Sequence, residues 1–114
     1  MASEAQEQEA VVEYCDLRHI PVYAIPNGGK RNPSEAAHLK RQGVRAGVPD
    51  LCIPAARGHY NGLYIEMKVG RNKPTEAQYE WIARLRENGY AAYVCYGAAN
   101  AIACIENYFG QVSK

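Results

Sequence analysis

Apolar residues recur at helical spacing over residues 3–18, which predicts an N-terminal helix. Ser3 has the side chain of a helix cap, and the stretch His19-Ile20-Pro21 ends the pattern. One face of this helix starts with two polar residues and becomes apolar further along: Glu4, Gln8, Val11, Val12 and Cys15. The predicted helix therefore carries polar groups at the start of a face that is otherwise suited to burial.

Short apolar runs predict four strands, over residues 22–25, 50–54, 63–69 and 90–96. Helical spacing and capping signals predict three more helices, over residues 33–43, 74–88 and 98–109. The inner face of the helix over 74–88 again starts with a polar residue, Gln78, ahead of Trp81, Ile82 and Leu85. The order α-β-(α)-β-β-α-β-α predicts an α/β fold, with a central mixed β-sheet flanked by helices in a single domain over residues 1–114.

Charged residues stand at neighbouring ends of the two central strands. The connection over residues 57–62 is short and favours an antiparallel hairpin, so Asp50, at the start of one strand, is expected near the end of the next. Glu66 and Lys68 are two residues apart on that second strand and therefore point to the same face. The sequence thus brings two carboxylates and an ammonium group to one place.

This convergence has two interpretations. Carboxylate oxygens suit Mg²⁺ or Mn²⁺, and a neighbouring lysine can orient an attacking water or help to deprotonate it. Such a set serves the metal-assisted hydrolysis of a phosphodiester. The alternative is a salt bridge at the rim of the sheet, between Lys68 and one of the two acids.

The overall composition is that of an ordinary globular domain of 114 residues with a net charge of +1. Its four cysteines have no C-x-x-C spacing, which predicts buried thiols in a reducing compartment and no zinc site. The three histidines are widely separated and are expected at the surface. No apolar stretch is long enough to span a bilayer, and the acidic N-terminus does not resemble a signal peptide, so we expect a cytoplasmic protein without a membrane partner.

Charge is distributed unevenly along the chain. Residues 1–16 hold five acids and neither Lys nor Arg, whereas residues 28–48 hold five basic residues and one acid, Glu35. A basic, glycine-containing segment of this kind can contact a phosphate backbone, and the alternative is an ordinary solvated helix and loop. The residues we expect to bind DNA are Lys30, Arg31 and Arg45.

The stretch Gly-Val-Pro-Asp over residues 47–50, followed by Glu-Met-Lys over 66–68, resembles the PD-(D/E)XK nuclease signature. The flanking runs Gly-Leu-Tyr-Ile-Glu-Met-Lys-Val and Gly-Tyr-Ala-Ala-Tyr-Val, with a Gln in the helix between them, resemble the VRR-NUC family in particular. The resemblance extends from Glu4 to about Tyr108, although the Val-Arg-Arg of the family name is matched only by Val44-Arg45-Ala46. It implies a restriction-endonuclease-like core in α-β-β-β-α-β order with an added C-terminal helix.

The resemblance also implies roles for individual residues. The implied metal ligands are Asp50, Glu66, Glu4 and the main-chain carbonyl of Met67. The implied catalytic residues are the same three acids together with Lys68 and Gln78. For the acid of the first helix, Glu7 is the alternative to Glu4.

Small VRR-NUC proteins of this length resemble phage and bacterial nucleases linked to branched DNA, including four-way (Holliday) junctions. The resemblance therefore implies a structure-selective endodeoxyribonuclease that uses Mg²⁺ or Mn²⁺, in the cytoplasm of a bacterial host if the protein is phage-encoded. Symmetric cutting of a four-way junction needs two active sites, so we expect a homodimer. The alternatives are a flap or nicking nuclease, a non-catalytic DNA-binding module of the same fold, and a small-molecule hydrolase with the same metal.

Overall fold

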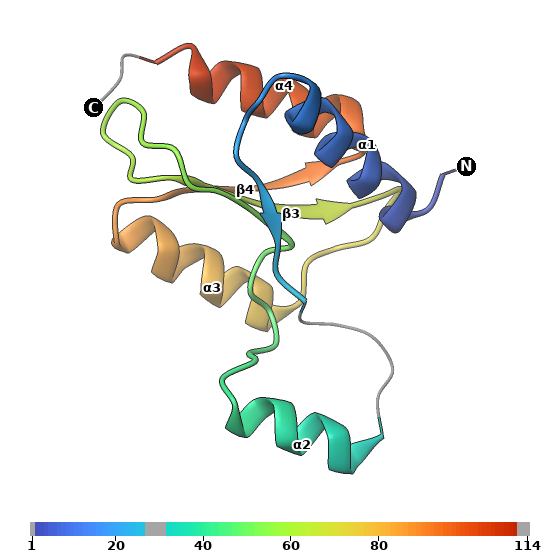
Figure 1. Ribbon diagram of the computed structural model, residues 1–114. Helices are drawn as coiled ribbons and strands as arrows, with labels where there is room; N and C mark the ends of the chain where they lie inside the picture. The colour runs from blue at the N-terminus through green and yellow to red at the C-terminus, as the bar shows by residue number, and fades with distance from the viewer. Residues whose placement is uncertain (1, 27–31, 112–114) are drawn as a thin grey trace.

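The computed structural model describes residues 2–26 and 32–111. Its strands form one mixed sheet in the order β1-β2-β3-β4 (Figure 1). The strands are β1 (Tyr23–Ala24), β2 (Leu51–Ile53), β3 (Leu63–Lys68) and β4 (Ala91–Tyr96). β2 pairs antiparallel with both β1 and β3, whereas β3 and β4 run parallel. β2 and β3 therefore form the antiparallel hairpin that the short connection predicts.

Helices cover both faces of this sheet. In Figure 1, α1 (Glu4–Leu17) and α4 (Ala98–Phe109) lie over one face, and α3 (Glu76–Glu87) lies over the other. α2 (Pro33–Arg41) stands away from the sheet, and none of the residues described in it is buried. The element order and the α/β class with a mixed central sheet are confirmed. The strand predicted over 22–25 shortens to two residues, and the helix predicted over 33–43 ends at Arg41.

The two faces of the sheet differ in character because side chains alternate along each strand. Toward α1 and α4, the strands place aliphatic side chains that pack with both helices in one core cluster: Leu51, Ile53, Leu63, Ile65 and Met67. Toward α3, the same strands place Cys52, Tyr64, Glu66 and Lys68. Glu66 and Lys68 are nevertheless buried, at 1% and 8% exposure. Two charged side chains are thus held inside the molecule beneath α3.

Three of the four cysteines are buried and all three histidines are exposed, as predicted for these side chains. All four cysteines lie within the described residues as free thiols, and three of them are buried. His19, His38 and His59 are exposed. Among residues 2–26 and 32–111, no helix combines the length and the apolar character needed to cross a membrane.

Candidate metal centre and active site

Asp50 is fixed at the start of β2 by its neighbours on both sides. Its side-chain Oδ2 accepts a hydrogen bond from the backbone N–H of Met67 at 2.8 Å, and its backbone carbonyl accepts one from the N–H of Ile25, also at 2.8 Å. The β2–β3 register, in which Leu51 pairs with Ile65, makes the first contact possible. The carboxylate therefore lies beside the C-terminal half of β3, where the sequence predicted it.

Gly47 brings the segment before Asp50 against the start of α3. Its φ is +91°, and a Cβ at this position would lie 2.6 Å from the backbone carbon of Ala77. A side chain would force the segment away from α3, because real Cβ atoms do not approach backbone that closely. The glycine of the Gly-Val-Pro-Asp stretch thus sets how near Asp50 lies to Gln78, which follows Ala77.

Glu66 is the centre of the site. Its Oε2 accepts a hydrogen bond from Nε2 of Gln78 at 3.1 Å and lies 3.7 Å from Nζ of Lys68. Its Oε1 is buried and accepts no hydrogen bond from any described residue. A buried carboxylate oxygen without a partner is unfavourable and points to a group that is bound there.

Gln78 has two roles at once. Its Oε1 accepts a hydrogen bond from the backbone N–H of Thr75 at 2.8 Å, which completes a capping box at the start of α3. Its Nε2 is thereby turned toward Glu66. The helix cap orients the amide, so the side chain reaches the carboxylate in one fixed orientation.

Glu4 joins the two strand acids from the first turn of α1. One carboxylate oxygen from each of Glu4, Asp50 and Glu66 lies within 4.8 Å of the others. Glu7, one turn further along α1, has a different partner: its Oε1 accepts a hydrogen bond from the backbone N–H of Ala98 at 3.2 Å. The structure thus brings Glu4, and not Glu7, to the acid cluster.

The cluster is electrostatically strained without a cation. Burial raises the pKa of Glu66 to about 8, and the nearby carboxylates of Asp50 and Glu4 act in the same direction. The ammonium of Lys68 acts in the opposite direction but does not compensate. Three acids at this spacing are therefore matched to a divalent cation, which would relieve the repulsion among them.

The donor set also fits Mg²⁺ or Mn²⁺ in chemical type, because it consists of oxygens. The carbonyl of Lys68 accepts a hydrogen bond from the N–H of Gly97 at 2.9 Å and so faces β4. Successive carbonyls of a strand point to opposite sides, so the carbonyl of Met67 faces β2 and Asp50. This carbonyl would supply an oxygen beside the three carboxylates.

The structure describes one of the three residues predicted to bind DNA. Lys30 and Arg31 lie outside the described residues. Arg45 follows the C-terminal end of α2. Its Nη1 donates a hydrogen bond to the backbone carbonyl of Lys40 at 2.7 Å, and the residue remains exposed. Sequence reasoning passed over two more exposed basic residues, Arg71 and Lys73, in the loop between β3 and α3. Both residues follow Lys68 closely in the chain, and this proximity could have marked them as DNA-binding candidates.

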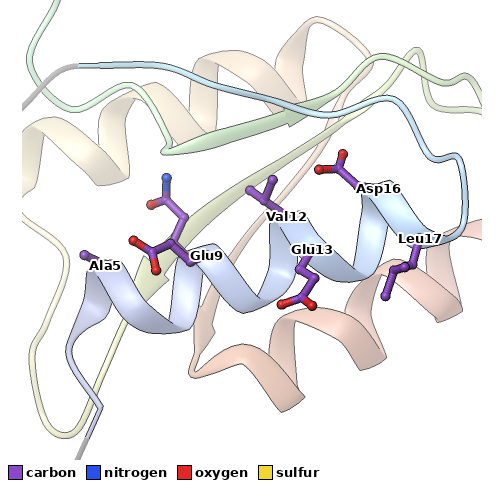
Figure 2. A pocket seen from close by; sticks show the side chains of 7 residues that line it. Ala5, Glu9, Val12, Glu13, Asp16 and Leu17 are labelled. Carbon is purple, nitrogen blue, oxygen red and sulfur yellow. The ribbon is translucent and has the colours of Figure 1, made fainter.

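A separate hollow lies along α1 and has a different character. Figure 2 shows side chains from successive turns of this helix around it, including Glu9, Glu13 and Asp16. Its volume is about 620 Å³. Three acids on this face would repel a phosphate backbone, so the hollow does not suit DNA.

The family described as "VRR-NUC domain" matches residues 2–99 of the chain. The chain belongs to the VRR-NUC domain family. A solved structure described as "VRR_NUC domain protein" is 35% identical, with a TM-score of 0.86, over 99% of this chain and 93% of that one.

A second solved structure, described as "VRR_NUC domain", is 22% identical, with a TM-score of 0.63, and covers 94% of this chain and 99% of that one. At this identity it shows a shared fold alone. No curated protein matches the chain. The VRR-NUC assignment makes this a nuclease-type domain, and the acid cluster beneath α3 is its candidate centre.

Proposed function

We propose that this VRR-NUC domain is a divalent-metal-dependent endodeoxyribonuclease that hydrolyses phosphodiester bonds at the cluster of Glu4, Asp50 and Glu66. The observation that carries the proposal concerns Glu66: its buried Oε1 accepts no hydrogen bond from the described residues, and one of its carboxylate oxygens lies within 4.8 Å of oxygens of Glu4 and Asp50. A structural salt bridge with Lys68 would not explain three carboxylates around one ammonium group.

Each residue of the site would have a distinct task. Asp50, Glu66, Glu4 and the carbonyl of Met67 would hold the cation. Mg²⁺ or Mn²⁺, when bound, would polarise the phosphate and lower the pKa of an attacking water. Gln78 would keep the Glu66 carboxylate in place through its amide.

Lys68 would act beside the cluster and not as a ligand, since ammonium groups do not bind cations. Its Nζ lies 3.7 Å from Oε2 of Glu66, on the same face of β3. From there its ammonium can orient the attacking water through a donated hydrogen bond, or offset negative charge that develops on the phosphate.

The proposed substrate is branched DNA, including four-way junctions. Exposed basic residues supply contacts that position a phosphate backbone without reading its sequence: Arg45, Arg71 and Lys73, to which we add Lys30 and Arg31. Paired cutting of a four-way junction requires two centres, and the described residues of each chain form one acid cluster. We therefore propose that the functional unit is a homodimer.

A panel of labelled linear, flap, splayed and four-way DNAs tests this function. The protein is expected to cut the four-way substrate fastest with Mg²⁺ or Mn²⁺ and to cut nothing in EDTA. Preferential cutting of flaps, or single nicks only, would replace the junction assignment with a flap or nicking nuclease. Binding without cutting in every metal would contradict an active centre and indicate a non-catalytic DNA-binding module.

A further inference from the structure

A groove with aromatic walls lies on the α3 side of the sheet. It has a volume of about 440 Å³ and lies between α3 and the segment that follows α2. Its apolar lining includes Tyr64, Trp81, Leu85, Val44 and Val48. Trp81 is half-buried and is the single tryptophan of the chain. The groove is therefore lined by aromatic and aliphatic side chains.

Two elements, β3 and α3, each carry at least one residue of the groove and one residue of the proposed active site. Tyr64 precedes Glu66 by two residues on β3, so both side chains point to the same face about 7 Å apart. Trp81 follows Gln78 by one turn on α3, about 5 Å along the helix. A chain held at the acid cluster would have its next unit at the mouth of the groove.

Two arginines lie at the same groove. Arg45 contributes to its lining, and the guanidinium of Arg84 lies over the Trp81 ring at 5.3 Å from the ring centroid. Lys40 and Arg41 are exposed nearby in sequence, at the end of α2. Aromatic walls with cations at the rim match a nucleotide, whose base is flat and apolar on its faces and whose phosphate is anionic.

We propose that this groove takes an unpaired nucleobase of the DNA strand that flanks the scissile phosphate, by stacking on Trp81. The proposal rests on the nuclease function and specifies the substrate further: the preferred DNA has an unstacked or single-stranded nucleotide beside the cut. Branched DNA offers such nucleotides at the branch, whereas intact duplex DNA must be opened first. A base subsite would thus favour branched DNA without sequence-specific contacts.

Trp81 itself is the probe for the test. The wild-type protein is titrated in EDTA with a duplex that carries a single-stranded tail, and Trp81 emission is followed together with the anisotropy of a dye on the DNA. Excitation at wavelengths that tyrosine does not absorb isolates Trp81. We expect the tail to quench Trp81, and a blunt duplex of equal charge to bind without quenching.

The matched control changes the DNA and leaves the protein intact. A tail of the same length with abasic sites keeps every phosphate but has no base to stack. We expect it to bind roughly tenfold more weakly than the normal tail, and without quenching, since one base–aromatic stack contributes on that scale.

Protein variants test the base subsite independently of changes in the DNA. Trp81→Ala should lose the difference between normal and abasic tails, whereas Trp81→Phe should keep part of it. Tyr79→Ala is the matched control, because Tyr79 is an aromatic residue of α3 that is 55% exposed and does not line the groove. Circular dichroism shows whether each variant is folded, and the abasic comparison needs no variant.

The outcomes separate this proposal from the nuclease assignment. Binding by anisotropy with unchanged Trp81 emission, or equal affinity for normal and abasic tails, overturns the base subsite and leaves the nuclease function standing. Trp81 emission that depends on protein concentration without DNA overturns it in favour of a second copy of the chain in the groove. A complete absence of DNA binding, both by wild type in EDTA and by the slow-cutting Lys68→Ala variant with Mn²⁺, contradicts both proposals.

Discussion

Glu66 is a buried acid that costs the fold stability when it ionises. It is 1% exposed and has two acids beside it, and burial raises its pKa to about 8 from an ordinary value of 4.5. At a pH between these two pKa values, Glu66 keeps its proton in the folded protein but has lost it in the unfolded chain. Without metal, the free energy of unfolding should therefore fall as the pH rises through this interval and stay low above it.

Glu66→Gln should remove that pH dependence, because the amide cannot ionise. In EDTA, above the upper end of the interval, the variant should melt higher than wild type, by roughly 4 °C for each kcal/mol recovered in a domain of this size. Thermal melts at several pH values check this, with Glu80→Gln on the exposed side of α3 as the control. Parallel pH profiles for wild type and Glu66→Gln would show that the buried carboxylate is not the cause.

Lys68 provides the second prediction at this scale. Lys68→Ala should slow DNA cleavage by about 10²-fold or more, the usual scale for a group that transfers or orients a proton. Metal binding should persist, since the oxygens of the site are untouched. Single-turnover cleavage at saturating protein is the measurement, with Glu80→Gln on the exposed side of α3 as the control. A Lys68→Ala rate equal to that of wild type would make this lysine structural.

At the scale of elements, α1 and α4 are joined at the ends that flank the site. α4 begins at Gly97 without a side-chain cap of its own, and Glu7 of α1 accepts the hydrogen bond from Ala98 N–H instead. Anionic groups are favoured at a helix N-terminus, where backbone N–H groups are unpaired. Because Glu4 is one turn before Glu7, this contact also fixes where Glu4 stands relative to β3.

Glu7→Ala should therefore destabilise the fold by about 1 kcal/mol, the scale of a lost helix cap, and weaken Mn²⁺ binding in parallel. Glu7→Gln keeps an acceptor oxygen and should restore most of the stability and most of the affinity for Mn²⁺. Urea unfolding in EDTA and calorimetric Mn²⁺ titration measure the two effects separately. If Glu7→Ala loses stability yet binds Mn²⁺ as wild type does, the contact supports α4 without positioning Glu4.

The parts of the site that follow from local sequence patterns could be predicted from the sequence. The short connection after β2 and the two-residue period of β3 were enough to place Asp50 beside Glu66 and Lys68. The contact between Glu7 and Ala98 spans 91 positions, and no local pattern signals it. The same holds for the second hydrogen bond of Gln78 and for the groove at Trp81, which require the packing of α3 on the sheet.

At the scale of the whole molecule, the part of each chain that the structure describes holds one acid cluster, so paired cutting is expected to require two chains. A mixed dimer of wild type and Glu66→Gln should nick a cruciform plasmid to open circles and yield little linear DNA. Sedimentation of the wild type should give about twice the 12.6 kDa of one chain. A monomer that linearises the plasmid in one binding event would contradict the dimeric unit.

Calorimetric titration with Mn²⁺ tests the central claim most directly, because it asks whether Glu4, Asp50 and Glu66 form one cation site. Wild type and the Glu80→Gln control are expected to bind Mn²⁺ at one shared affinity, with protons released as Glu66 ionises. Asp50→Asn and Glu66→Gln should lose binding by tenfold or more, as expected when a ligand is removed. Equal Mn²⁺ binding by all four proteins would contradict a metal centre at these acids.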